Sequence, residues 1–379
     1  MIAASVKDFR ALARRRLPLL MFDYLDGGAY GELTLRKNVE DLEALALRQL
    51  VMRDVSQLSM KTEWFGQQTT MPVALGPVGF AGMFARRGEV QAARAAQAAG
   101  VPFCLSTVSI CSLEEVVAKT GQPIWQQLYM IKDRGFMAAF LERITAQRTP
   151  VLVMTVDLPV VGARYRDVHS GMSAPPGLKS TLQRAWQGLT HRDWLFDVQL
   201  SGQPLIFGNL KDAVKDARGV GQFSQWVQQN FDAGVTWKDL DFVRRHWKGP
   251  LVIKGLLDPA DAREALANGA DGIIVSNHGG RQLDGALSSV KAMPAIVDAI
   301  GGKVPLFMDG GVRSGLDVLR CLALGAQGVF LGRAWAYALA ADGERGVKRA
   351  LDIIRAELRV AMALTGCTDV RRAGPDLLA

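Results

Sequence analysis

The sequence predicts an α/β fold, a (β/α)8 TIM barrel with an N-terminal helical cap and a long insertion after the fourth strand. Three observations carry this prediction. Short apolar runs recur along the 379 residues, and most are followed by an amphipathic helical pattern. Eight such runs occur, whereas an open doubly wound sheet usually has about five or six strands. Polar residues also gather where the runs end, as they do at the carboxyl face of such barrels.

The expected strands are continuous apolar runs, which is typical of parallel strands covered on both faces. In chain order they are Pro72–Gly76, Pro102–Ser106, Ile124–Tyr129, Val151–Val156, Leu251–Lys254, Gly272–Ser276, Leu306–Asp309 and Gly328–Leu331. The clearest helical patterns are Gly88–Ala99, Asp133–Ala146, Pro259–Asn268, Leu316–Leu324 and Gly346–Leu364.

We expect residues 1–379 to form one domain, with a cap over 1–70, the barrel over 71–340 and a C-terminal helix and tail over 341–379. Residues 157–245 are far too many for an ordinary strand-to-helix connection. Within them, the excursion 178–231 mixes tryptophans with basic residues: Trp186, Trp194, Trp226, Lys179, Arg184, Arg192, Lys211, Lys215 and Arg218. It is either a surface excursion or lid, or an interfacial segment that rests on an anionic bilayer.

Composition narrows the class of protein. The formal net charge is +8, but the basic residues are scattered and form no tract, which argues against nucleic acid as a partner. The four cysteines form no C-x-x-C pair and Met1–Arg16 has no apolar core of a signal peptide, so we expect a reducing compartment. The longest apolar stretch, Met71–Ala85, is interrupted by Pro77 and falls short of the ~20 residues that span a bilayer.

The most informative segment runs from Ser276 to Asp284, directly after an expected strand. His278 is a candidate general base because imidazole titrates near neutrality. Arg281 offers a guanidinium fork for a carboxylate or phosphate. The two glycines between them allow a sharp turn and a close approach to a ligand.

Other expected strands end in polar residues as well. These are Gln127 to Tyr129, Thr155 to Asp157, Lys254, Asp309-Gly310-Gly311-Val312-Arg313 and Gly332-Arg333. Any one of them could serve barrel-top hydrogen bonds alone. The last two combine glycine backbone amides with guanidinium groups, a phosphate signature after the final two strands. Together the strand ends favour a phosphate-bearing cofactor or substrate.

Motifs along nearly the whole chain resemble the FMN-dependent L-2-hydroxy acid dehydrogenase/oxidase family. They are Tyr24-Leu-Asp-Gly-Gly-Ala, Gly76-Pro-Val-Gly79, Leu105-Ser-Thr-Val-Ser109, Gln127-Leu-Tyr129, Thr155-Val-Asp157, Arg164, Lys254-Gly255, Ser276–Gly285 and Asp309-Gly-Gly-Val-Arg313. Within this family the likeness is strongest to bacterial respiratory L-lactate dehydrogenases, through Asp26-Gly-Gly-Ala-Tyr30, Ala85–Gln91, Gly162–Arg166 and His169–Met172.

The resemblance implies roles for the polar residues. His278 is implied as the base that takes the proton from the 2-hydroxy acid, and Asp157 as the carboxylate that stabilises the resulting imidazolium. Tyr129 would hydrogen-bond the substrate oxygen. The substrate carboxylate would be held by Arg164, Arg281 and the Tyr24 hydroxyl.

The implied cofactor is FMN, and no metal is expected. Lys254 would lie beside the N1/O2 edge of the flavin ring, where a fixed cation favours reduction. Ser106, Gln127 and Thr155 would bond the polar ring edges. The remaining implied cofactor-binding residues are Gly79, Ser276, Asp309, Gly310, Gly311, Arg313, Gly332 and Arg333.

Two positions bear on substrate size. Family members that act on small hydroxy acids with oxygen as acceptor usually carry alanine where Gly79 stands, and glycolate oxidase-like members carry a bulky aromatic at the position of Val108. Both residues here leave more room. L-lactate is the favoured substrate, and mandelate or a longer aliphatic hydroxy acid remains open.

The resulting expectation is an FMN-dependent L-lactate dehydrogenase that passes electrons to a quinone or other respiratory acceptor. It would contact the cytoplasmic face of the inner membrane peripherally, and the resemblance suggests a homotetramer. The alternatives are a soluble 2-hydroxy acid oxidase that makes hydrogen peroxide, a mandelate-type dehydrogenase, a phosphate-binding barrel without redox chemistry, and a nucleic-acid or scaffold protein.

Overall fold

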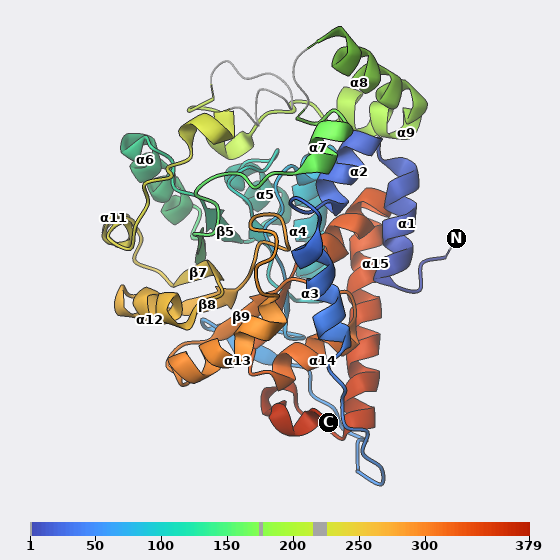
Figure 1. Ribbon diagram of the computed structural model, residues 1–379, viewed down its shortest axis with the longest axis vertical. Helices are drawn as coiled ribbons and strands as arrows, with labels where there is room; N and C mark the ends of the chain where they lie inside the picture. The colour runs from blue at the N-terminus through green and yellow to red at the C-terminus, as the bar shows by residue number, and fades with distance from the viewer. Residues whose placement is uncertain (1, 174–176, 215–225) are drawn as a thin grey trace.

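Eight parallel strands form a barrel in the structure, a computed structural model that describes residues 2–173, 177–214 and 226–379 (Figure 1). They are β3 (Val73–Leu75), β4 (Cys104–Leu105), β5 (Trp125–Leu128), β6 (Leu152–Thr155), β7 (Leu251–Leu256), β8 (Gly272–Val275), β9 (Leu306–Asp309) and β10 (Gly328–Leu331). Their order is β3-β10-β9-β8-β7-β6-β5-β4, and a parallel bridge between Leu75 and Phe103 joins the two ends. The (β/α)8 barrel and all its expected strands are therefore confirmed.

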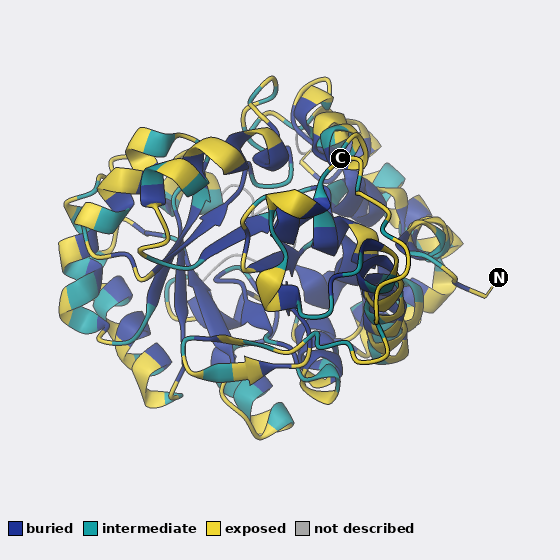
Figure 2. Ribbon diagram, turned by 90° about the horizontal axis from the view of Figure 1, so that it is seen from below, coloured by how far each residue is buried: buried dark blue, intermediate teal, exposed yellow. Residues whose placement is uncertain are grey.

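The barrel interior is filled by large side chains. Phe307 of β9 contacts Phe330 of β10 and Trp64, with ring centroids 5.6 and 5.1 Å apart. Trp64 comes from a hairpin of β1 (Thr62–Trp64) and β2 (Gln67–Thr69). It packs so closely on Gly328 that a Cβ there would lie 2.0 Å from its ring. The lower end of the barrel is thus a packed core and not a channel; the buried strands are visible from this end in Figure 2.

Helices surround the barrel with their outer faces exposed (Figure 2). They are α4 (Gly88–Ala99), α5 (Leu113–Thr120), α6 (Arg134–Ala146), α11 (Asp239–His246), α12 (Pro259–Ala267), α13 (Ser289–Ile300), α14 (Gly315–Ala323) and α15 (Arg333–Thr365). Many start where a short polar side chain accepts a hydrogen bond from a backbone N–H of the first turn, as Ser112, Asp133 and Ser288 do. In α15 the backbone is non-helical at Asp342 and Gly343, so the C-terminal helix continues the last barrel helix across a kink.

Three helices precede the barrel: α1 (Val6–Arg16), α2 (Leu19–Asp26) and α3 (Leu33–Glu43). Helix α1 packs against α15 (Figure 1). Helix α2 carries Tyr24 to the mouth of the barrel, where its ring packs edge-on against Phe80 at 5.3 Å between centroids. The N-terminal helices therefore contribute directly to the carboxyl end of the barrel.

The long excursion between β6 and β7 contains α7 (Tyr165–His169), α8 (Leu178–Thr190), α9 (Arg192–Trp194), a π-helical turn η2 (Leu195–Leu200), a 3-10 turn η3 (Gly208–Leu210) and then α11. Figure 1 shows α8 and α9 projecting beyond the barrel next to α7 and α2. Lys215 and Arg218 lie outside the described residues. In the described ranges, no helix has the combination of length and hydropathy needed to cross a membrane.

The three tryptophans of the excursion do not share one environment. Trp186 is exposed and Trp226 half-buried, but Trp194 is buried, and its indole N–H donates to the Met83 carbonyl at 2.7 Å. The expectation that Trp194 faces a bilayer is therefore wrong. Its polar nitrogen finds a partner inside the protein, so it anchors the excursion to the barrel loop around Met83.

Candidate active site

A cavity of about 450 Å3 opens at the carboxyl ends of the strands. Most of the residues expected to bind substrate or cofactor line it: Tyr24, Gly79, Ser106, Tyr129, Thr155, Arg164, Lys254, His278, Arg281, Asp309, Gly310, Gly311, Arg313, Gly332 and Arg333. Asp157, Gln127 and Ser276 do not line it but lie one layer behind, each within reach of a lining residue. The structure therefore brings the expected site together from both halves of the chain.

The candidate base is held by a buried carboxylate. His278 Nδ1–H donates to Asp157 Oδ1 at 2.7 Å, which leaves Nε2 unprotonated and 3.4 Å from the Tyr129 hydroxyl. His278 has φ 57°, and its backbone N–H donates to Ser276 Oγ at 3.0 Å. The turn after β8 thus directs the free lone pair of the imidazole toward the cavity.

The pKa values of this pair move in the same direction. Burial lowers the pKa of His278 below its usual value, although Asp157 opposes the shift. Burial acts to raise the pKa of Asp157, but the nearby His278 and Lys254 outweigh it, and the net pKa is lowered. At neutral pH the imidazole is therefore neutral and the carboxylate ionised. This is the state in which His278 can accept a proton and Asp157 can stabilise the cation that forms.

Two guanidinium groups converge beside the base. Arg281 Nη1 donates to the carbonyls of Tyr24 at 2.6 Å and Gly27 at 2.8 Å, and its Cζ lies 4.8 Å from the centroid of the Tyr24 ring. Arg164 Nε donates to the Arg281 carbonyl at 3.4 Å. Burial, with the Arg281 charge, lowers the pKa of Arg164 to about 10. The crowding of these two partly buried cations is relieved when an anion binds between them.

The cavity also carries polar atoms that suit a flavin. Lys254 Nζ donates to Ser276 Oγ at 2.8 Å and pairs with Asp309 Oδ2 at 3.1 Å. Burial acts to lower the pKa of Lys254, but Asp309 and Asp157 outweigh it and the pKa is raised, so the ammonium persists. Gln127 Nε2, Thr155 Oγ1 and Asp309 Oδ1 are buried and have no hydrogen-bond partner among the described residues. Thr155 and Asp309 line the cavity, so the polar edge and ribityl hydroxyls of FMN would satisfy their two atoms.

The loops after β9 and β10 fit the phosphate of that cofactor. Gly310 and Gly311 have φ 96° and 86°, and a Cβ on Gly311 would lie 2.0 Å from the Asn38 carbonyl, so this turn requires glycine. Gly332 precedes the first turn of α15, whose backbone N–H groups favour an anion. Arg333 donates to the carbonyls of Leu25, Gly27 and Gly279 at 2.7 to 3.1 Å. Burial lowers its pKa to about 9, which a phosphate would offset.

Sequence patterns did not single out two buried acids at this site. Glu89 Oε1 accepts hydrogen bonds from the backbone N–H groups of Gly82 and Ile110, both at 2.9 Å. It thereby ties together the loops that carry Gly79 and Val108. Glu89 occupies the first turn of α4, where acidic residues are common because they interact favourably with the helix dipole. The local sequence therefore does not distinguish Glu89 from an acid that only stabilises the helix. Asp167 lines the cavity, and its Oδ2 lies 3.9 Å from Arg164 Nη1. The i, i+3 spacing of these two residues is the sequence pattern that could have indicated the pair.

Among residues 2–173, 177–214 and 226–379 there is no group of three His, Cys, Asp or Glu side chains arranged to hold a metal ion. The charged atoms of the cavity are mainly guanidinium and ammonium groups, which attract anions and not cations.

Comparison with known proteins gives consistent relatives. The family described as FMN-dependent dehydrogenase matches residues 13–379. An L-lactate dehydrogenase of Azorhizobium caulinodans is 56% identical over 100% of this chain and 99% of its own length. An L-lactate dehydrogenase of Caulobacter vibrioides is also 56% identical, over 100% of this chain and 98% of its own length. The crystal structure of (S)-mandelate dehydrogenase, described as a monotopic membrane protein, is similar with TM-score 0.92 and 34% identity over 100% of both chains. Mandelate oxidase with (S)-4-hydroxymandelic acid gives TM-score 0.85 and 35% identity over 100% of this chain and 98% of the other.

Proposed function

The chain belongs to the FMN-dependent dehydrogenase family, and we propose on this premise that it oxidises L-lactate to pyruvate in the cavity at the carboxyl end of the barrel. The observation that carries the proposal is the arrangement of charged and basic side chains in this cavity. His278, with its unprotonated Nε2, lines the same cavity as the guanidinium groups of Arg164 and Arg281, and Lys254 lines it too. A base, an anion clamp and a cation beside the cofactor are what oxidation of a 2-hydroxy acid requires.

In this proposal the substrate carboxylate lies between Arg164 and Arg281, with the Tyr24 hydroxyl as a third donor. The substrate hydroxyl then faces His278 Nε2 and Tyr129. His278 takes up the proton that the 2-hydroxy acid loses, and Asp157 stabilises the imidazolium through the 2.7 Å hydrogen bond. FMN, when bound, accepts the two electrons. Lys254 holds positive charge at the polar edge of the cofactor site, where negative charge develops on reduction.

Anaerobic reduction tests the proposal directly. Purified protein should be yellow, and its visible absorbance should bleach when L-lactate is added without oxygen. Glycolate and (S)-mandelate, mixed at the same concentrations, provide the comparison. A preparation that stays colourless after incubation with FMN, or a yellow protein that L-lactate does not bleach, would exclude the proposed reaction.

A mandelate-type activity is the second candidate, because two small residues, Gly79 and Val108, line the pocket side by side. The nearest atom to a Cβ built on Gly79 is Val108 Cγ2 at 2.8 Å, so these two small side chains together set the width of the pocket. The similar (S)-mandelate dehydrogenase and mandelate oxidase act on an aromatic hydroxy acid by their names. Faster bleaching by (S)-mandelate than by L-lactate would favour this candidate. Hydrogen peroxide formed in equal amount with pyruvate would instead favour a soluble oxidase.

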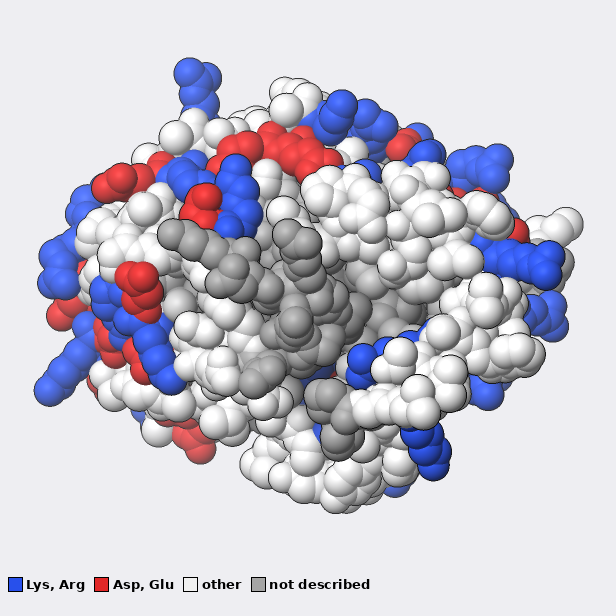
Figure 3. Space-filling view, turned by 90° about the horizontal axis from the view of Figure 1, so that it is seen from above, with Lys and Arg blue, Asp and Glu red and all other residues white. Residues whose placement is uncertain are grey.

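We further propose that the acceptor is a quinone and that the protein binds the cytoplasmic face of the inner membrane peripherally through α8. Leu178, Leu182, Trp186 and Leu189 lie at i, i+4, i+8 and i+11 along this helix, and each is at least 60% exposed. Phe196 and Leu200 of η2 add two further exposed apolar side chains. Figure 3, seen from the end where α8 projects, shows broad uncharged areas between Lys and Arg side chains. An apolar face beside cations suits an anionic bilayer.

The opposite face of α8 is fixed to the protein. The buried side chain of Gln187 accepts from the Leu20 backbone N–H at 2.8 Å and donates to the Ser170 carbonyl at 2.9 Å. Asp197, just beyond α9, pairs with Arg16 at 2.9 Å. These contacts orient the helix so that its apolar face points outward, where a membrane can reach it.

Membrane binding is tested with the variant Leu182→Ser/Trp186→Ser. It should lose co-sedimentation with anionic phospholipid vesicles while its reduction of a soluble dye by L-lactate stays unchanged. The matched control is Val360→Ser, which removes an exposed apolar side chain from α15. Unchanged sedimentation of the double variant would overturn the role of α8. The tetramer suggested by the family likeness is tested separately by light scattering of the detergent-free protein.

A further inference from the structure

A second cavity of about 370 Å3 adjoins the candidate active site. It lies at the carboxyl ends of β5, β6 and β7, beneath the segment 231–240 that leads into α11. Most of its lining is apolar: Met130, Met154, Val156, Leu158, Pro159, Phe231, Val235, Trp237, Leu240 and Leu256. Its volume is within the range of small-molecule sites, and its composition suits an uncharged apolar ring.

The two cavities are separated by a wall one side chain thick. Tyr129, Thr155, Leu158 and Phe231 line both of them. The rings of Tyr129 and Phe231 pack at 4.8 Å between centroids and form part of this wall. Thr155, whose hydroxyl is unpartnered among the described residues, belongs to the polar edge of the proposed cofactor site. A molecule in the second cavity would therefore sit close to the cofactor without displacing the substrate.

The first cavity is poorly suited to an apolar acceptor. Its substrate end holds the partly buried guanidinium groups of Arg164 and Arg281, which an uncharged ring would desolvate further without compensating their charge. The described lining of the second cavity contains no Lys or Arg side chain, and its charged residues are Asp232 and Asp261. Trp237 lines this cavity, and its indole N–H is a donor suited to a carbonyl oxygen.

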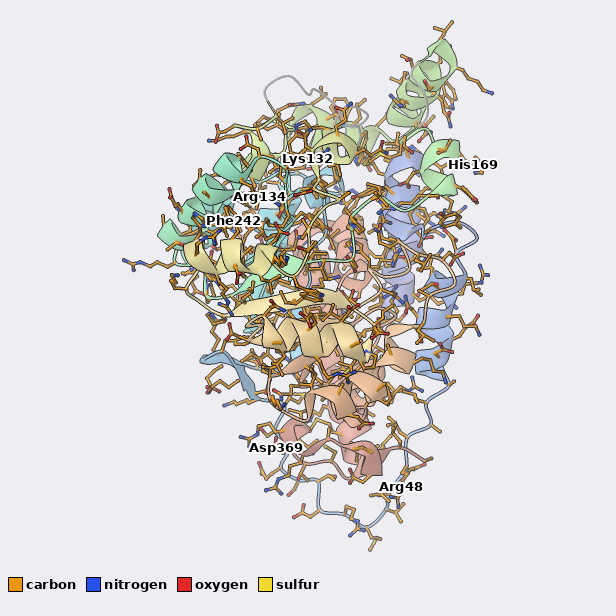
Figure 4. The ribbon with its side chains drawn as sticks, turned by 60° about the vertical axis from the view of Figure 1, so that its left-hand side comes forward. Arg48, Lys132, Arg134, His169, Phe242 and Asp369 are labelled. Carbon is orange, nitrogen blue, oxygen red and sulfur yellow. The ribbon has the colours of Figure 1, made fainter. Side chains whose placement is uncertain are left out.

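The segment 231–240, which covers the second cavity, is firmly attached to the barrel. Arg134 of α6 pairs with Asp232 at 2.5 Å and Asp239 at 2.8 Å, and its Cζ lies 5.9 Å from the centroid of the Phe242 ring. Lys132 Nζ donates to the Gln229 carbonyl at 2.6 Å. Figure 4 shows Lys132, Arg134 and Phe242 together on this side of the molecule. The cavity is thus a built feature of the fold, held by ion pairs on its outer side.

We propose that this second cavity binds the ring of the quinone acceptor, so that substrate and acceptor occupy different sites on either side of the Tyr129–Phe231 wall. The inference rests on the proposed function. L-lactate loses two electrons and two protons to become pyruvate, and the quinone takes up two electrons and two protons to become the hydroquinone. Separate sites allow each half-reaction to proceed without release of the other ligand.

The test measures the two half-reactions separately by stopped-flow absorbance in the FMN-loaded protein. Val235→Trp should fill the cavity from its half-buried rim. We expect the rate of bleaching by L-lactate to change less than twofold. Reoxidation of the bleached protein by decylubiquinone should slow at least tenfold, while reoxidation by ferricyanide, a small charged acceptor, should be unaffected. The control Val360→Trp places the same bulk on the exposed face of α15 and should change neither rate.

Unchanged reoxidation by decylubiquinone would overturn the proposal. So would a parallel loss of bleaching by L-lactate, because it would assign the cavity to the substrate. If Val235→Trp does not fold, Trp237→Phe provides the second test, with an expected several-fold rise in KM for decylubiquinone and none in KM for L-lactate. Wild-type protein that L-lactate fails to bleach would contradict the proposed function instead, so the two failures are distinguishable.

Discussion

At the scale of single residues, the His278–Asp157 pair joins a neutral imidazole, the proposed base, to an ionised carboxylate. The 2.7 Å hydrogen bond and the burial of both groups make this arrangement possible. His278 also occupies a left-handed backbone conformation at φ 57°, which restricts what can replace it.

Replacement of the base should therefore use asparagine, which tolerates that conformation. His278→Asn should stay folded and yellow but lose roughly 10²- to 10⁴-fold in the rate of bleaching by L-lactate, because the proton acceptor is gone. Stopped-flow absorbance measures this rate. Bleaching at the wild-type rate would remove His278 from the role of base.

The lowered pKa of His278 predicts a pH profile. The neutral imidazole accepts the proton, so bleaching at low L-lactate is fast above the pKa and falls as the pH drops through it. Because burial lowers this pKa, the midpoint should lie below the usual value of 6.5. Asp157 raises the pKa, so Asp157→Asn should move the midpoint lower still and reduce the maximal rate. A midpoint above 6.5 in the wild type would contradict this account.

Gly79 and Val108 should behave as a coupled pair. A Cβ at position 79 would lie 2.8 Å from Val108 Cγ2, closer than such contacts normally occur, so Gly79→Ala must displace the Val108 side chain. We expect Gly79→Ala to lower kcat/KM and the added Val108→Ala to restore much of it. A double-mutant cycle on L-lactate and (S)-mandelate should give a coupling of about 0.5–3 kcal/mol. Strictly additive effects would show that the two side chains do not share the pocket.

At the scale of elements, α2 and α7 position two residues of the proposed carboxylate clamp. Tyr24 lies on α2, and Arg164 immediately precedes α7. Arg166 of α7 joins the helices: its Nε donates to Asp23 at 2.9 Å, and its Nη1 pairs with Asp26 at 3.0 Å. The position of the clamp therefore depends on an ion-pair cluster outside the cavity.

The variant Arg166→Met should loosen this attachment. Because the guanidinium is partly exposed, we expect a loss of about 2 kcal/mol in stability, between the values for exposed and buried pairs. KM for L-lactate should rise more than kcat falls, since the clamp and not the base is displaced. Arg345→Met, which removes the exposed pair with Asp342, is the control. Thermal unfolding and steady-state kinetics measure both effects, and an unchanged KM would argue against positioning by Arg166.

At the scale of the whole molecule, the cofactor site joins the cap to the barrel. Arg333 donates to carbonyls of residues 25 and 27 in the cap and of Gly279 after β8, while the glycines after β9 contact Asn38 of α3. Binding of FMN should therefore stabilise the fold as a unit.

FMN at about 100 times its Kd should add about 2.7 kcal/mol of stability and raise the Tm of the apoprotein by several degrees. Riboflavin, which lacks the phosphate, should give a smaller shift. Arg313→Met should reduce the shift with FMN and leave that with riboflavin unchanged, since Arg313 lines the cavity at the proposed phosphate site. Equal shifts for FMN and riboflavin in the wild type would place the phosphate elsewhere.

The sequence by itself determined the barrel and the chemical character of its carboxyl end. Continuous apolar runs specify buried parallel strands, and because such strands end at one face, His278, Lys254 and the glycine loops after Leu306–Asp309 and Gly328–Leu331 had to lie near one another. These are local patterns, so one sequence is enough to recognise them.

Only the tertiary structure decided which distant residues complete the site. Tyr24 reaches the mouth because α2 packs there, and only the family resemblance, not the local pattern, had suggested it. Trp194 turned inward to the Met83 carbonyl, and Glu89 became a link between two loops. The second cavity exists because segment 231–240 folds back over β5 to β7. Each of these depends on packing between residues far apart in the chain, which local periodicity and residue type do not encode.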